Sequence, residues 1–372
     1  MLTWQQVIGP EDLAHVLPVL EDWAKGVAVA TDNAESFVLD STMEFLNMND
    51  MSMLYKILGC VSWSCNLQPY PLCKCNKGEA LEDRVAADGT PIEHLCKVIT
   101  DEEQQECYEK SLLFYAKVKR LNPALDEIKI KDRVKKWSME NNYGITHYGL
   151  KPHLFKLSKV VPDGLHQRSS IAKTMMDNTR TVVNKGSIET QDKFHDHLLK
   201  SPDNPDGIFR LSHMVIWQCQ KKFDCFTGAE LGLFTKNAAA LADWMEKSNI
   251  STEGSLEFTS LCTALRCWTR IDAFLTIAVV QPSDNLTVNS SVLYDGAYEN
   301  SMRYFEEDIE TFYKAGKNCF LLGNSGRSEY AGETVYLHTL RFHTPRLMRK
   351  IWTKHGLPIG CFNMQGFERR NQ

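Results

Sequence analysis

The sequence predicts an α/β fold with a large, mainly helical part. Near the N-terminus, apolar residues follow helical spacing over 8–26, extended spacing over 36–49 and helical spacing again over 51–58. Such alternation is typical of α/β folds. Residues 192–325 show mostly helical periodicity. A chain of 372 residues has room for two or more domains, or for one domain with a large insertion.

The composition narrows the class of protein. Hydrophobic residues make up 43% of the chain, and the net charge is −5, which excludes a protein that is basic throughout but allows a local basic surface. No apolar stretch approaches the roughly twenty residues of a membrane span, and the N-terminus lacks the pattern of a signal peptide. We therefore expect a nuclear or cytoplasmic protein, not secreted, whose twelve cysteines are buried thiols or metal ligands.

The first strand-to-helix junction contains an acid. Pro10 near its start and Gly26 at its end suit the predicted helix 8–26. The extended segment then ends at Asp50, and Gly59 closes the next helix. Ligands often bind at the carboxyl end of a strand in an α/β sheet, but Asp is also a preferred helix N-cap. Both interpretations of Asp50 remain open.

Cysteines and histidines suggest a second kind of site. A cysteine cluster follows the junction, with Cys60, Cys65, Cys73 and Cys75. His338 and His343 lie five residues apart in a predicted helix, within reach of one metal ion if partner ligands come from elsewhere. Thiolates and imidazoles are the ligands of structural zinc, although Cys-x-Cys spacing is weaker than Cys-x-x-Cys. Buried unpaired thiols explain the spacing equally well.

Two further segments have alternative interpretations. Residues 101–140 are charged and helical in pattern, and their basic and aromatic stretches at 114–120 and 133–137 could line a DNA groove or form a solvated helix face. Residues 149–163 predict a loop and a short strand. Asp163 then opens a long helix, and His166 and Arg168 follow closely. These three residues could form a functional site, or they could have structural roles only.

The remaining chain is expected to be mostly helical. The predicted helices are 194–199, 208–219, 227–247, 255–279 and 293–315. Cys262 and Cys267 have apolar neighbours on one of these helices, so we expect them to be core thiols.

Taken together, these motifs resemble the catalytic core of DDE cut-and-paste transposases, in the group that includes the V(D)J recombinase and hAT-like elements. The most specific segment is His338-x4-His343 followed by Gly-Phe-Glu368, and Asp50 with its cysteines comes next. The resemblance implies an incomplete RNase H-like core with a large helical insertion. The implied domains are a partial core with the cysteine cluster at 1–75, the insertion at 76–330 and a catalytic and zinc-histidine segment at 331–372.

The resemblance assigns roles to individual residues. Asp50 matches the second metal-binding acid of the family and Glu368 the third. His338 and His343 match the zinc histidines, and Cys73 matches the second zinc cysteine. Tyr70 stands where the first zinc cysteine is usual, so Cys75 or Cys65 would have to replace it. The implied metals are Mg²⁺ or Mn²⁺ for catalysis and Zn²⁺ for structure.

The first acid has no counterpart under this assignment, because no strand precedes the helix 8–26. We favour it because a strand with the first acid should continue into a hairpin, whereas Asp50 leads into a helix. The isolated chain is then expected to be inactive or nearly so. The alternative assignment makes Asp50 the first acid and Asp163 the second.

The expected function is transposase-like DNA cleavage and strand transfer by two-metal chemistry, in a degenerate or truncated protein. DNA is the expected partner, and a homodimer is a candidate assembly. The first alternative is a non-catalytic DNA- or protein-binding module derived from a transposase. The second is an unrelated hydrolase using Asp163 and His166, which no nucleophile motif such as G-x-S-x-G supports.

Overall fold

The computed structural model describes 27–30, 36–39, 47–49, 51–61, 73–74, 98–153, 156–162, 164–198, 207, 214–217, 220–223, 228–248, 255–277, 286–288, 291–294, 298–321, 334–355 and 358–361. The chain divides into two compact units, Met1–Pro162 and Asp163–Gln372. Each unit is described by itself. The predicted helix 8–26 lies outside the described residues.

The first unit contains two small pairs of strands. The strands β1 (Val27–Ala30) and β2 (Ser36–Leu39) form an antiparallel hairpin. The strands β3 (Asn47–Asn49) and β4 (Val160–Pro162) pair in parallel. Helix α2 (Met51–Ile57) follows β3, and the short 3-10 helix η3 (Leu157–Lys159) precedes β4. The predicted helix 51–58 and the predicted short strand within 149–163 are therefore confirmed, whereas the segment 36–49 forms two separate strands.

Gly59 ends α2 in a conformation that only glycine adopts readily. Its φ is +63°, and a Cβ atom built there would lie 2.4 Å from the backbone nitrogen of Gly149. We expect Gly59→Ala to lower the free energy of unfolding by about 2 kcal/mol or more, as measured by urea denaturation. Gly232→Ala is the matched control, because a Cβ there meets nothing within 4 Å in helix α7. It should stabilise the protein by roughly 0.5–1 kcal/mol, and equal losses for the two variants would contradict this account.

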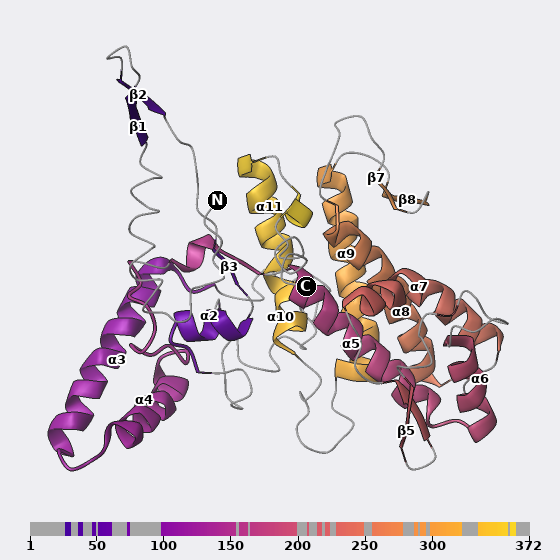
Figure 1. Ribbon diagram of the computed structural model, residues 1–372, viewed down its shortest axis with the longest axis horizontal. Helices are drawn as coiled ribbons and strands as arrows, with labels where there is room; N and C mark the ends of the chain where they lie inside the picture. The colour runs from indigo at the N-terminus through magenta and orange to yellow at the C-terminus, as the bar shows by residue number, and fades with distance from the viewer. Residues whose placement is uncertain are drawn as a thin grey trace, which may run out of the picture. The chain divides into compact units, whose positions relative to one another are not determined.

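The helices α3 (Asp101–Leu121) and α4 (Glu127–Asn141) form a helical hairpin in the first unit (Figure 1). Thr100 caps α3 in a reciprocal capping box with Glu103, and Asp126 caps α4. The two helices pack through a small buried cluster of Val118, Ile130 and Val134. The predicted helical character of residues 101–140 is confirmed.

The second unit is a helical assembly. Its helices are α5 (Gly164–Val183), α6 (Ile188–Leu198), α7 (Gly228–Lys247), α8 (Leu256–Leu275), α9 (Tyr298–Gly316), the short π-helix η5 (Lys317–Leu321), α10 (Val335–Phe342), α11 (Thr344–His355) and the 3-10 helix η6 (Ile359–Cys361). Helix α8 packs against α5, α7 and α9, as Figure 1 shows. The rings of Trp268 and Phe274 on α8 are fully buried.

Two predictions for this unit are borne out and two need correction. Cys262 and Cys267 are buried core thiols, as expected. The segment 208–219, predicted to be helical, contains β5 (Met214–Trp217), which pairs with β6 (Gln220–Phe223). The start of the predicted helix 293–315 falls in β8 (Ser291–Tyr294), which pairs with β7 (Leu286–Val288), and α9 begins only at Tyr298. Helices 227–247 and 255–279 are confirmed within a few residues.

The described part of the chain is mostly helical, and every sheet in it has two strands. Among the described helices, none is both long enough and apolar enough to cross a membrane.

Candidate metal sites

The parallel strands β3 and β4 pair two segments of the first unit that are far apart in the sequence. Their register pairs Asn47 with Val160 and Asn49 with Pro162. Because both strands run the same way, both chains leave the pair at the same edge. The next residue after each strand is an aspartate, and a helix follows directly, α2 after Asp50 and α5 after Asp163. The side chains of Asp50, Asp163 and Glu368 lie outside the described residues.

Arg168, which the sequence places near Asp163, has a structural partner. Its guanidinium group donates to both carboxylate oxygens of Asp272, at 2.6 and 2.9 Å, and Asp272 is 5% exposed. This buried pair joins α5 to α8. Arg168 is therefore engaged in holding the second unit together, which weakens the hydrolase interpretation of the Asp163 and His166 corner.

Breaking this ion pair should be costly. We expect Asp272→Ala to lower the free energy of unfolding by about 3–5 kcal/mol, because it leaves the Arg168 charge partly buried without its partner. Chemical denaturation measures the loss. Asp243→Ala is the control, because its ion pair with Arg266 is largely exposed and should contribute at most about 1 kcal/mol. A loss below 1 kcal/mol for both variants would contradict a structural role for the Arg168–Asp272 pair.

Helix α10 positions two histidines. Its N-cap residue is Thr334, whose hydroxyl accepts a hydrogen bond from the Leu337 backbone nitrogen. His338 lies within the helix, and His343 is its C-cap residue. Pro345 lacks an N–H to continue the hydrogen-bond pattern of α10, so the chain restarts as α11 at Thr344. The predicted continuous helix through both histidines is thus two helices with His343 at the junction.

The two imidazole rings lie close together. Their centroids are 5.5 Å apart, and both side chains are buried. Burial, reinforced by the nearby His338 and Arg346, holds the pKa of His343 well below its usual range. His343 is therefore neutral at physiological pH, which is the form of imidazole that binds a metal ion.

The helices around the histidine pair are fixed by polar contacts. Arg341 donates to both carboxylate oxygens of Glu310 on α9, at 3.0 and 2.6 Å. The Tyr313 hydroxyl on α9 donates to the backbone oxygen of Leu337. Gln167 on α5 donates to the Thr344 hydroxyl at 3.0 Å. These contacts attach α10 and the start of α11 to α9 and α5, so neighbouring helices position the backbone that carries both histidines.

Cys73 is the described member of the predicted cysteine ligands. Its side chain is fully buried, and its backbone forms a β-bridge with Val98 of the first unit. Cys75, Cys65 and Tyr70 lie outside the described residues. Cys73 offers a thiol, and the two histidines offer ring nitrogens, so the described candidates have the donor types and the burial that structural zinc requires.

Three other buried thiols lie outside the predicted metal cluster. Burial raises the pKa of Cys107 to about 11, of Cys262 to about 12 and of Cys267 to about 11. These thiols stay protonated at neutral pH, and none of them was expected to bind metal.

The chain matches none of the known protein-family models and none of the curated proteins with which it was compared.

Proposed function

We propose that this protein performs transposase-like phosphodiester chemistry on DNA, with an RNase H-like catalytic core. The supporting observation is the parallel, in-register pairing of β3 with β4, each followed by an aspartate and then by a helix. It favours the assignment of Asp50 as the first acid and Asp163 as the second, in place of the assignment that leaves the first acid without a counterpart. Glu368 is the proposed third acid.

The chemistry needs acids at these positions. Divalent ions, when bound, activate the attacking oxygen and stabilise the leaving oxygen of a phosphodiester. Mg²⁺ and Mn²⁺ prefer carboxylate oxygens. In this proposal the chain supplies two carboxylates from the residues that follow the paired strands β3 and β4, and a third from its C-terminal segment.

We further propose a structural Zn²⁺ site with His338 and His343 as ligands, for which the family resemblance implies Cys73 and either Cys75 or Cys65 as the thiolates. The support within the second unit is the burial of both histidines, the lowered pKa of His343 and the 5.5 Å between the two ring centroids. Such a zinc ion would stabilise the fold and take no part in cleavage.

A nicking assay tests the proposed catalysis. The full chain should convert supercoiled plasmid to nicked circles with Mn²⁺ or Mg²⁺. Ca²⁺, which tolerates irregular coordination, should support binding with little cleavage. A chain that binds DNA but never nicks it, at any concentration of Mn²⁺, would contradict the proposal.

The second candidate function is a non-catalytic DNA-binding module. Residues 117–136, at the end of the α3–α4 hairpin, carry eight cations and three acids, a net charge of +5 in a chain whose total is −5. A local basic surface of this kind binds phosphates without any catalytic acid. Salt-dependent binding without nicking would identify this function.

A further inference from the structure

The α3–α4 hairpin contains a pocket of about 360 Å³ with an unusual lining. Its lining includes Phe114, Lys117 and Leu121 of α3 and Arg133, Lys136 and Trp137 of α4. We call it the hairpin pocket. On each helix these residues recur at spacings of three and four, so each set forms one face of its helix. The pocket is thus a trough between two helix faces, entirely within the first unit.

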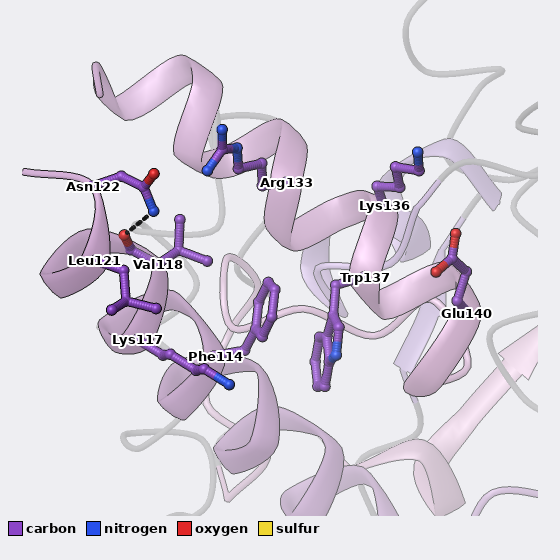
Figure 2. Close-up of a pocket in the computed structure, with 9 residues that line it drawn as sticks. All are labelled: Phe114, Lys117, Val118, Leu121, Asn122, Arg133, Lys136, Trp137 and Glu140. Carbon is purple, nitrogen blue, oxygen red and sulfur yellow. Dashed lines mark hydrogen bonds between the residues drawn. The ribbon is translucent and has the colours of Figure 1, made fainter. Parts of the chain in front are cut away.

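Aromatic and apolar side chains form the floor of the hairpin pocket. The rings of Phe114 and Trp137 are stacked, with centroids 4.5 Å apart and planes 9° from parallel. Figure 2 shows the two rings side by side between the helices. Both rings are half-buried, and Leu121 at the other end of the trough is 64% exposed. Ring faces and apolar surface therefore remain accessible.

Three cationic side chains also line the hairpin pocket. Lys117 extends from α3, and Arg133 and Lys136 extend from α4, as Figure 2 shows. All three are exposed, and none makes an ion pair within the part of the chain that the structure describes. The acids nearest the hairpin turn pair elsewhere: Glu127 with Lys119 and Asp126 with Lys129. The pocket thus presents three unpaired cations and one acid, Glu140.

We propose that the hairpin pocket binds a single strand of nucleic acid. The apolar floor suits the face of an unpaired base, and the three cations suit the phosphates on either side of it. A duplex keeps its base faces stacked inside and would use only the cations. Glu140 at one end of the trough would repel phosphate there, which directs the strand toward Lys117 and Arg133. That the strand is DNA rests on the proposed function.

Binding of a fluorescent ten-residue oligothymidine to the full chain, measured by anisotropy at several salt concentrations, tests this proposal. The wild-type chain should bind with a steep salt dependence. The triple variant K117A/R133A/K136A should lower the slope of log K against log salt by about 2, since each phosphate contact on a single strand contributes about 0.7. The control is Lys129→Ala, which removes an exposed lysine of α4 that is paired with Asp126. It should leave the slope nearly unchanged.

The aromatic floor has its own test. Trp137→Leu should weaken oligothymidine binding about tenfold, because it removes a stacking surface, whereas Trp137→Phe keeps a ring and should stay within about threefold of wild type. Circular dichroism of each variant verifies folding. Equal losses in the Leu and Phe variants, or no oligothymidine binding at 50 mM salt, would overturn the proposal.

Two outcomes separate this proposal from the proposed catalysis and from a protein partner. A chain that nicks plasmid but does not bind oligothymidine overturns only the pocket proposal. A chain that binds oligothymidine through Trp137 but never nicks supports the pocket and contradicts the catalysis. Binding of an acidic helical peptide that requires Trp137, together with no oligothymidine binding, would identify the pocket as a protein-docking site and overturn the proposal.

Discussion

An Asp163→Asn variant should lose Mn²⁺-dependent nicking of supercoiled plasmid by about a hundredfold or more. The substitution keeps the shape of the side chain but removes the negative charge that holds a divalent ion, and each 1.36 kcal/mol of lost transition-state stabilisation costs a factor of ten. Asp50→Asn should cause a loss of the same order, because β3 and β4 end in register and we assign the two acids to one site.

Asp177→Asn is the matched control for this experiment. Asp177 lies on α5, the helix that Asp163 precedes, and pairs with Arg180 near the surface. Its removal should leave nicking within about twofold of wild type. Full activity in the Asp163→Asn variant with loss in Asp50→Asn would contradict the pairing of these acids and restore Asp50 as the second acid of an incomplete set.

Loss of the proposed zinc site should have the second large effect. We expect the purified chain to contain one zinc ion per chain, measured by plasma mass spectrometry. His338→Ala and Cys73→Ser should each release it. Binding of structural zinc contributes on the order of 10 kcal/mol in small domains, so even partial loss should lower the unfolding temperature by more than about 5 °C.

The zinc prediction needs a control that also disturbs a buried thiol. Cys262→Ser alters a fully buried thiol on α8, so it should reduce stability but leave the zinc content unchanged. Its thiol lies in the core and donates to the Ala242 backbone oxygen, and it is not one of the proposed ligands. Full zinc content in the Cys73→Ser and His338→Ala variants would contradict the proposed site.

Local features of the fold could be predicted from the sequence. Met51–Ile57 and Gly164–Val183 were expected as helices because an aspartate precedes each and apolar residues recur at helical spacing. The failure at Met214–Trp217 has an equally local cause. Four consecutive apolar residues suit a buried helix or a strand, and periodicity cannot distinguish them over so short a run.

The site depends on contacts that no local pattern contains. The pairing of Asn49 with Pro162 joins segments more than a hundred residues apart, and it changes which acid assignment is favoured. The partner of Arg168 is likewise distant, because Asp272 lies on α8, so the sequence could not show that Arg168 has a structural role. The spacing of His338 and His343 did suggest that both could bind one metal ion. Pro345, two residues after His343, ends the hydrogen-bond pattern of α10, so His343 is the C-cap of that helix and not part of a continuous one.

The central claim is that Asp50 and Asp163 hold divalent ions together, and a Mn²⁺ titration followed by electron paramagnetic resonance tests it most directly. We predict that Asp50→Asn and Asp163→Asn each weaken binding of the same Mn²⁺ ion by about tenfold or more, and that the double variant is little weaker than either single one, since the two acids act as one site. Independent, additive losses, or a Mn²⁺ affinity that Asp163→Asn leaves unchanged, would contradict the account.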